Sequence, residues 1–182
     1  MTTLLVTGGV RSGKSRHAES LLATTPEVTY VAAGPAPEAE ADPDWTARVA
    51  AHRARRPVSW GCVESTDLAG ALAEARGSVL IDCLGSWLPG LLDQHELWEA
   101  PVAEVTELVE RQVAETVAAL GAHQAGIPGA DVVIVTNEVG MGIVPAYRSG
   151  RLFRDLLGTV NQQVAAACDE VHLVVAGRVL VL

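Results

Sequence analysis

The sequence GGVRSGKS at residues 8–15 constrains the fold of this chain more than any other segment. It matches the pattern G-x-x-x-x-G-K-[ST], with an apolar run at residues 3–7 before it and a helical pattern from Lys14 onward. In such a strand–loop–helix unit the glycines let backbone N–H groups turn toward phosphate oxygens, and the helix N-terminus adds partial positive charge. The sequence therefore predicts a nucleotide-binding loop between a buried strand and a helix.

Lys14 is the only lysine among the 13 Lys and Arg residues of the chain. A slim ammonium reaches between phosphates where the planar fork of Arg fits poorly. We expect Lys14 to contact the β- and γ-phosphates and Ser15 to bind Mg²⁺. The predicted nucleotide-binding residues of the loop are Gly8, Gly9, Val10, Arg11, Ser12, Gly13, Lys14 and Ser15.

Short apolar runs alternate with helical patterns along the rest of the chain. Most of the runs are continuous, as is typical of parallel strands covered on both faces, and the final VHLVVAGRVLVL indicates an antiparallel hairpin. We predict an α/β fold of the P-loop type over residues 1–182 as a single domain, with a doubly wound, mostly parallel sheet of about seven strands. Strands are expected at 3–7, 28–32, 58–63, 79–83, 132–136, 171–175 and 179–182, and helices at 14–23, 44–55, 67–76, 101–123 and 149–168, with Ser65 and Thr66 capping the third helix.

Composition excludes several classes of protein. The formal net charge is −9 and no basic stripe is present, which argues against a nucleic-acid partner. No apolar run reaches the roughly 18 residues of a membrane span, and no signal peptide is recognisable. Cys62, Cys83 and Cys168 are far apart and lie in apolar stretches, so we expect buried, reduced thiols in a cytoplasmic protein.

Asp82 ends the apolar run of VLIDCLGSW. A carboxylate in this position commonly orients Mg²⁺, directly or through water, although an Asp here could also simply cap the next turn. The N-K-x-D tetrad that reads guanine in switch GTPases is absent from the sequence, which disfavours a regulatory GTPase.

The segment RVAAHRARRP, residues 48–57, concentrates positive charge in an acidic chain. On a helix, Arg48, His52 and Arg55 share one face, and Arg53 and Arg56 flank it. Surrounding cations would keep the imidazole neutral and offset the charge of a phosphate under attack, which favours His52 as a nucleophile. A solvated basic helix face is the alternative.

A glycine-rich loop, NEVGMGIVP, follows the predicted strand at 132–136, where open α/β sheets place their ligands. Asn137 and Glu138 could contact substrate or act as a base. For Arg148, Arg151 and Arg154, substrate phosphate contacts and surface pairing are both open. The Pro/Glu/Ala-rich segment 34–44 is predicted to be a mobile active-site loop.

Together, GGVRSGKSRHAE, AHRARRP, LIDCLGSWL, VTNEVGMGIVP and RLFRDLLGTVNQQVAAACDEVHLVVAG resemble the bifunctional adenosylcobinamide kinase / adenosylcobinamide-phosphate guanylyltransferase family from about residue 3 onward. The resemblance implies a RecA-like sheet and two reactions. ATP or GTP phosphorylates the aminopropanol hydroxyl of adenosylcobinamide, and GTP then donates GMP to that phosphate, which gives adenosyl-GDP-cobinamide and pyrophosphate.

The resemblance also implies residue roles. The family's second step passes through a guanylylated histidine, which corresponds to His52; some members carry a His-His pair here, where this chain has Ala51. Further nucleotide contacts correspond to Ala33, Gly34, Pro35, Arg53, Ala54, Arg55, Arg56, Glu64 and Asp82, and a homotrimer is expected. A small-molecule P-loop kinase without nucleotidyl transfer and a non-catalytic nucleotide-binding regulator are the alternative functions.

Overall fold

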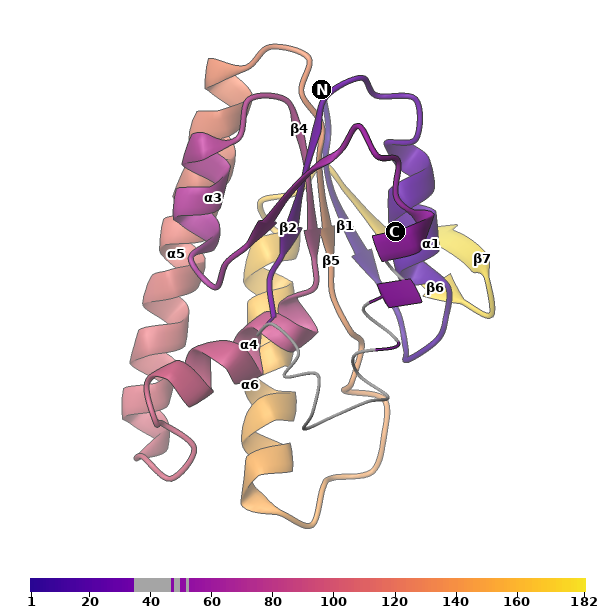
Figure 1. Ribbon diagram of the computed structural model, residues 1–182. Coiled ribbons are helices and arrows are strands. Elements are labelled where there is room, and N and C mark those ends of the chain that lie inside the picture. The colour runs from indigo at the N-terminus through magenta and orange to yellow at the C-terminus, as the bar shows by residue number, and fades with distance from the viewer. Residues whose placement is uncertain (35–46, 48–49, 52) are drawn as a thin grey trace.

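A seven-stranded sheet in the order β3-β2-β4-β5-β1-β6-β7 forms the centre of the computed structural model, which describes residues 1–34, 47, 50–51 and 53–182 (Figure 1). Every neighbouring pair is parallel except β6 and β7, which form the expected antiparallel hairpin. The predicted sheet is therefore confirmed. Its strands are β1 (Thr3–Thr7), β2 (Val28–Ala32), β3 (Gly61–Glu64), β4 (Ser78–Asp82), β5 (Val132–Val135), β6 (Glu170–Val175) and β7 (Arg178–Val181).

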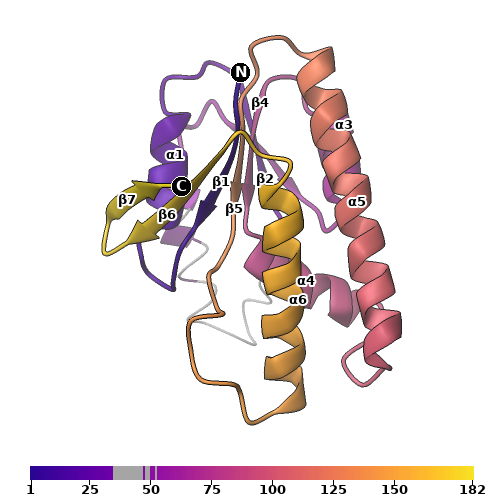
Figure 2. The same cartoon turned by 180° about the vertical axis from the view of Figure 1, so that it is seen from behind.

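Helices cover both faces of the sheet unequally. Figures 1 and 2 show α1 on one face, and α3, α4, α5 and α6 on the other. Of the helix predicted at 44–55, the structure describes residues 47, 50–51 and 53–55, and all of these are helical. The bounds are α1 (Lys14–Leu21), α3 (Leu68–Glu74), α4 (Leu84–Gln94), α5 (Val102–Gly126) and α6 (Arg148–Ala165).

The alternation of side chains along each strand divides the core into two clusters. In β4, Val79 and Ile81 belong to the larger cluster, which packs against α3 to α6. Leu80 belongs to the smaller one, with Tyr30 of β2 and Leu22 after α1. Because both faces are covered, the central strands β1, β4 and β5 are largely apolar, whereas the edge strands β3 and β7 are exposed.

Helix α4 was not predicted from the sequence. It contains Gly85, Pro89 and Gly90, and Gly and Pro are the poorest helix formers. Its burial explains why it forms, since Trp87 and Leu88 are 1% and 0% exposed in the larger cluster. Packing of this apolar face outweighs the weak local preference.

Two further details differ from the sequence-based expectations. The cap of α3 is Asp67, whose carboxylate accepts a hydrogen bond from the Gly70 N–H at 2.8 Å, and not Ser65 or Thr66. The third strand begins only at Gly61, because Pro57 and Trp60 form a turn in which the Trp60 N–H donates to the Pro57 carbonyl at 3.1 Å. None of the described helices has the length and apolar content that a bilayer crossing requires.

The β6–β7 hairpin turns at Ala176 and Gly177, which have φ of 49° and 75°. Two residues with positive φ match the right-handed twist of the flanking strands. The Gly177 N–H donates to the carbonyl of Ser12 at 2.8 Å. The hairpin therefore lies directly against the glycine-rich loop at residues 8–15.

Candidate nucleotide-binding site

The glycine-rich loop lies at the carboxyl end of β1, and two of its glycines are required by the geometry. A Cβ on Gly8 would lie 2.4 Å from the carbonyl oxygen of Val174 in β6. Gly13 has a φ of 99° at the start of α1. A side chain at Gly8 would push β6 away, and one at Gly13 would strain the turn into the helix.

Lys14 lies in the first turn of α1 with only 8% of its surface exposed. Its Nζ donates to the carbonyl oxygen of Gly9 at 3.3 Å, so the ammonium folds back over the loop. Within the described residues, the buried Ser12 hydroxyl has no hydrogen-bond partner. A buried donor of this kind, in a loop rich in N–H groups, fits a phosphate oxygen.

Asp82 ends β4 beside the loop, and both of its carboxylate oxygens are engaged. Oδ1 accepts a hydrogen bond from the Ser15 hydroxyl at 3.3 Å, and Oδ2 accepts one from the Tyr30 hydroxyl at 3.2 Å. The N-cap of α4 is Cys83, one residue after Asp82.

The Ser15 and Asp82 side chains supply hydroxyl and carboxylate oxygens, the donors that Mg²⁺ prefers. Mg²⁺ in such sites is usually held by one or two carboxylates together with substrate phosphates. The donor set therefore fits a magnesium ion that arrives with a nucleotide.

Ala33 and Gly34 follow β2 and lie close to this carboxylate. The Ala33 N–H donates to the Asp82 carbonyl at 3.4 Å, and a Cβ on Gly34 would lie 2.6 Å from Cβ of Ser86 in α4. The structure thus brings these two predicted residues to the same end of the sheet as the loop. Pro35 and most of the segment predicted as a mobile loop (34–44) lie outside the described residues.

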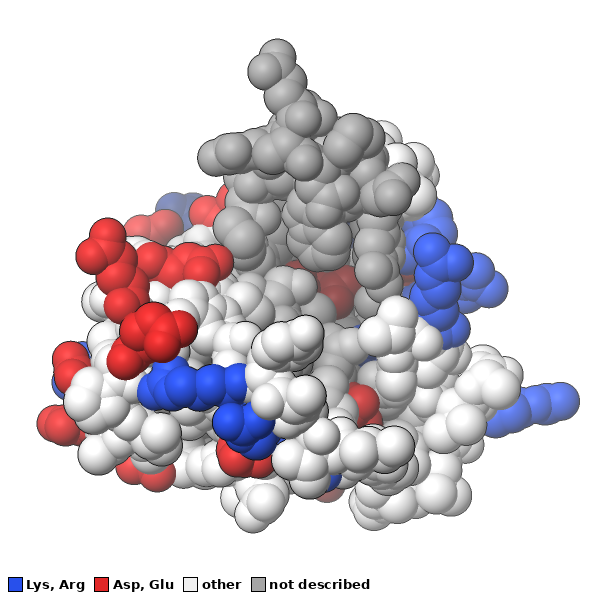
Figure 3. Space-filling view, turned by 90° about the horizontal axis from the view of Figure 1, so that it is seen from below, with Lys and Arg blue, Asp and Glu red and all other residues white. Residues whose placement is uncertain are grey.

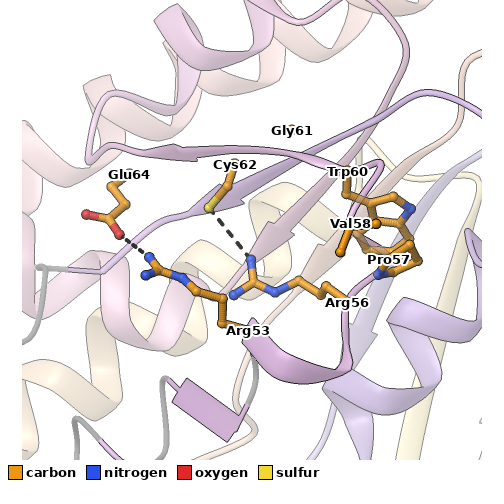
Figure 4. Close-up of a pocket in the computed structure, with 8 residues that line it drawn as sticks. All are labelled: Arg53, Arg56, Pro57, Val58, Trp60, Gly61, Cys62 and Glu64. Atoms are coloured by element: carbon orange, nitrogen blue, oxygen red, sulfur yellow. Dashed lines mark hydrogen bonds and ion pairs between the residues drawn. The ribbon is translucent and has the colours of Figure 1, made fainter.

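A pocket of about 410 Å³ lies beside β3 (Figure 4). Two of its lining residues, Arg53 and Glu64, form an ion pair, with 2.9 Å between Nη2 and Oε1. The Arg56 guanidinium carbon lies 3.6 Å from the centre of the Tyr30 ring, and its Nη1 donates to Sγ of Cys62 at 3.7 Å. The lining residues are Arg53, Arg56, Pro57, Val58, Trp60, Gly61, Cys62 and Glu64. We call this space the arginine pocket.

Not all members of the predicted basic cluster face the arginine pocket. Arg55 forms a two-pronged interaction with Glu19 of α1, at 3.2 and 3.3 Å. Ala54 is exposed on the helix, and Arg48 and His52 lie outside the described residues. Of the predicted arginines that the structure describes here, it brings Arg53 and Arg56 together with Glu64.

Charge is unevenly distributed at the end of the molecule where the parallel strands finish. In Figure 3 acidic side chains gather toward the left of this face, and basic side chains lie along its right side and also below the acidic group. A local basic cluster is thus compatible with the net charge of −9.

Tyr30 joins the arginine pocket to the carboxylate, and sequence reasoning missed it. It is 5% exposed in β2. Burial, and then the negative charge of Asp82, raise the pKa of its hydroxyl far above the usual value, so the group is a permanent donor. The signal in the sequence is weak: a single tyrosine in a short, mostly apolar run, two residues before Ala32.

The loop after β5 is tied to the fold by backbone contacts. The Glu138 N–H donates to the Gly8 carbonyl at 3.2 Å, and its Oε1 accepts from the Gly140 N–H. Asn161 of α6 donates to the Asn137 carbonyl at 3.0 Å and accepts from the Thr136 hydroxyl at 2.6 Å. Asn137 and Glu138 thus connect this loop to the glycine-rich loop and to α6.

The three arginines after this loop bind backbone carbonyls. Arg148 donates to the carbonyls of Trp98 and Ala100, Arg151 to those of Pro145 and Ala146, and Arg154 to that of Gly140. Substrate phosphate contact and surface pairing, the two alternatives that the sequence left open, stay predictions. The arginines hold loop segments in place.

A histidine pair lies between α1 and β6. Nε2 of His17 is 2.8 Å from Nδ1 of His172, whose Nε2 is 3.2 Å from Oε2 of Glu170. Burial, and then the neighbouring His172, lower the pKa of His17. Because His17 is held in this pair, its ring is directed toward β6.

The cysteines are reduced but less buried than expected. Cys62 is exposed, and Cys83 and Cys168 are half-buried. Cys62 lies on the edge strand β3, where a side chain has a neighbour on one side only. Burial, and then Asp169, raise the pKa of the Cys168 thiol to about 12, and burial, then Asp82, raise that of Cys83, so neither is a thiolate near neutral pH.

A strand, a glycine-rich loop with a buried lysine, and a carboxylate on a neighbouring strand bonded to the loop serine together define a P-loop nucleotide-binding protein. The profile of the cobinamide kinase / cobinamide phosphate guanyltransferase family matches residues 4–182. The chain belongs to this family of enzymes.

Characterised relatives resemble the chain over nearly its full length. It is 41% identical to the bifunctional adenosylcobalamin biosynthesis protein CobU of Escherichia coli (strain K12), over 96% of each chain. It is 40% identical to the CobU protein of Salmonella typhimurium (strain LT2), over 96% of each, and 35% identical to the CobP protein of Pseudomonas aeruginosa, over 95% of this chain and 92% of the relative.

Among solved structures, an ATPase from a bacterial type III secretion system superposes with a TM-score of 0.53 at 10% sequence identity. The superposition covers 94% of this chain and 50% of that one. This likeness concerns the fold alone, which is that of P-loop nucleotide-hydrolysing proteins.

Proposed function

We propose that this protein phosphorylates adenosylcobinamide with ATP or GTP, and then transfers GMP from GTP to adenosylcobinamide phosphate. The observation that supports this best is the position of the arginine pocket, which Tyr30 joins to the Asp82–Ser15 pair of the glycine-rich loop. A loop that holds a phosphate tail and a basic pocket beside it can serve two reactions on different phosphorus atoms.

In the kinase step the chain mainly positions the reacting groups and neutralises phosphate charge. The backbone N–H groups of the loop and Lys14 hold the β- and γ-phosphates, and the Ser12 hydroxyl adds a donor. Ser15 and Asp82 would hold Mg²⁺, which offsets phosphate charge when bound. The substrate hydroxyl oxygen forms a bond to the γ-phosphorus, the bond to the β-bridging oxygen breaks, and the hydroxyl proton is released.

In the transfer step His52 acts as the nucleophile. Its neutral ring nitrogen forms a bond to the α-phosphorus of GTP, and the bond to the bridging oxygen breaks to release pyrophosphate. A phosphate oxygen of adenosylcobinamide phosphate then attacks the same phosphorus, and the P–N bond breaks to return the free imidazole. Arg53 and Arg56 offset the charge that develops on the phosphates during both displacements.

The covalent route is tested with GTP that carries ³²P at the α-position. We expect a protein-bound label that resists alkali and is lost in acid, the behaviour of a phosphoramidate. His52→Ala should abolish the label and the transfer of GMP while the phosphorylation of adenosylcobinamide continues. The matched control is His95→Ala, because His95 is exposed at the end of α4 and should not affect labelling.

The outcomes separate the alternatives. A kinase step without any label in the unaltered protein would identify a small-molecule P-loop kinase. Binding of GTP with no turnover of either kind, with adenosylcobinamide present, would identify a nucleotide-binding regulator. Label that persists in His52→Ala would move the nucleophile to another residue.

We further propose that the protein is a homotrimer, as the resemblance implies, of single-domain chains, residues 1–182, in the cytoplasm, as the length and the cysteines indicate. Light scattering should give three times the 19.0 kDa of the chain. One cooperative unfolding transition supports the single domain, and cell fractionation checks the location. A monomeric mass at working concentrations would contradict the trimer.

A further inference from the structure

Tyr30 touches two functional groups through different parts of its side chain. In the sheet it pairs with Leu80, two residues before Asp82 on the neighbouring strand. Side chains two residues apart on a strand point to the same face, so the hydroxyl reaches Oδ2 of Asp82, at 3.2 Å. On the other side, the Arg56 guanidinium carbon lies 3.6 Å from the ring centre.

We propose that Tyr30 is a positioning residue that holds the Asp82 carboxylate and the Arg56 guanidinium in place at once. The inference rests on the proposed nucleotide chemistry, because it assigns Asp82 to the metal and Arg56 to the arginine pocket. Tyr30 itself touches neither nucleotide nor metal. It acts through its two neighbours.

The hydroxyl fixes the rotation of the carboxylate. A carboxylate can turn about its bond to Cβ, and the hydrogen bond at 3.3 Å from Ser15 to Oδ1 constrains one oxygen only. The Tyr30 hydroxyl constrains the second oxygen, so that Oδ1 stays directed toward the loop. Partners that orient a metal-binding carboxylate are commonly worth about 10- to 100-fold in metal affinity or activity.

The ring restricts Arg56. An arginine side chain is long and flexible, and its Nη1 donates to Sγ of Cys62 at 3.7 Å. The 5%-exposed ring provides a rigid, buried surface, and the guanidinium carbon lies 3.6 Å from its centre. Cation–π contact adds attraction in this geometry.

Two substitutions separate the two roles. Tyr30→Phe removes the hydroxyl and keeps the ring, whereas Tyr30→Leu removes both. The matched control is Tyr147→Phe, because Tyr147 is the other tyrosine of the chain and is 81% exposed. Each protein is loaded with GDP, and Mn²⁺ binding is measured by electron paramagnetic resonance; GDP affinity is measured separately in EDTA.

We expect Tyr30→Phe to weaken Mn²⁺ binding to the GDP complex about tenfold and to leave GDP affinity in EDTA unchanged. Tyr30→Leu should lose the same metal affinity and, in addition, bind GDP about threefold more weakly in EDTA. In the kinase assay the Mg²⁺ concentration for half-maximal rate should rise in both variants, with a smaller change in kcat at saturating Mg²⁺. A purely structural role would not produce this split.

Unchanged Mn²⁺ affinity in Tyr30→Phe would overturn the role of the hydroxyl, and unchanged GDP affinity in Tyr30→Leu would overturn that of the ring. If Tyr30→Leu unfolds, Arg56→Gln tests the ring from the half-exposed side of the contact. In the double variant Tyr30→Phe/Arg56→Gln the ring remains. GDP binding should be no weaker than in Arg56→Gln alone, and metal binding no weaker than in Tyr30→Phe alone. Because these are binding measurements, they stand even where the GMP transfer to adenosylcobinamide phosphate fails.

Discussion

Lys14 is buried beside the glycine-rich loop, since only 8% of its surface is exposed and its Nζ donates to the Gly9 carbonyl. We predict that Lys14→Ala lowers the rate of phosphoryl transfer by about 10²-fold or more, because an oriented cation is lost where charge develops. Lys14→Arg should not restore the rate, since the planar guanidinium does not fit the same space. Initial rates with saturating nucleotide and Mg²⁺ measure both.

The control for the Lys14 variants is Arg111→Ala on the exposed face of α5, which removes a positive charge far from the glycine-rich loop. Its rate should match that of the unaltered protein. A Lys14→Arg variant with full activity would show that only the charge matters at this position.

At the scale of single residues, the sequence predicted those parts of the site whose spacing is local. The glycine-rich loop with Lys14 and Ser15 lies within eight residues, and Asp82 ends a recognisable strand. Tyr30 could not be predicted because its contact with Asp82 depends on the register between β2 and β4. The pair of His17 and His172 likewise depends on where β6 lies beside β1.

The cap of α3 is an element whose contribution can be measured directly. The Asp67 carboxylate accepts from the Gly70 N–H at 2.8 Å, and a helix start without such a partner leaves a donor unsatisfied. We predict that Asp67→Ala lowers the free energy of unfolding by about 1 kcal/mol, measured by urea denaturation. Asp155→Ala on the exposed side of α6 should change it by less than about 0.5 kcal/mol. Equal losses in the two variants would contradict the capping role.

The contact between α1 and β6 should make stability depend on pH. The pKa of His17 in the folded state lies below its ordinary value of 6.5. Above pH 6.5 the His17 ring is neutral in both the folded and the unfolded state, and its contribution to stability is fully present. As the pH falls below 6.5, the ring takes up a proton in the unfolded state first, so the free energy of unfolding decreases. The thermal midpoint should therefore be lower at pH 5.5 than at pH 7.5, two values that lie about one pH unit on either side of the ordinary pKa.

The variant His17→Gln should flatten this pH dependence, because it removes the titrating group. His95→Gln, at the exposed end of α4, should leave the slope as it is. If the thermal midpoint of His17→Gln changes with pH as much as that of the unaltered protein, the pair of His17 and His172 is not the origin of the pH dependence.

Most elements could be predicted because both faces of the sheet are covered, so that strands read as continuous apolar runs. The bounds of β1 and β2 are those expected from the sequence. Helix α4 could not be predicted, because Gly85, Pro89 and Gly90 argue locally against a helix and only the packing of residues such as Trp87 explains it. Its burial depends on neighbours far away in the sequence.

At the scale of the whole molecule, the hairpin turn and the glycine-rich loop stabilise each other. Gly177 has a φ of 75°, and its N–H bonds to Ser12. We predict that Gly177→Ala loses about 1 kcal/mol of stability through left-handed strain and also weakens GDP binding, because the loop shifts. Calorimetric titration with GDP measures the second effect.

Gly129→Ala provides a matched control for Gly177→Ala. Gly129 has a φ of 89°, and nothing lies within 4 Å of an added Cβ, so the strain is comparable but the site is remote. Both variants should lose stability, and only Gly177→Ala should lose affinity. Equal GDP affinity in the two would show that the hairpin does not support the loop.

The place of β1 in the sheet has a consequence for synthesis on the ribosome. β1 is made first among the strands, but its partners on either side are β5 and β6. The strand that carries the glycine-rich loop therefore has no partner strand until β5, which begins at Val132, has been translated. The loop receives its last support, from the Gly177 N–H, only when the hairpin has emerged. A nascent chain should thus bind nucleotide weakly until Gly177 has emerged.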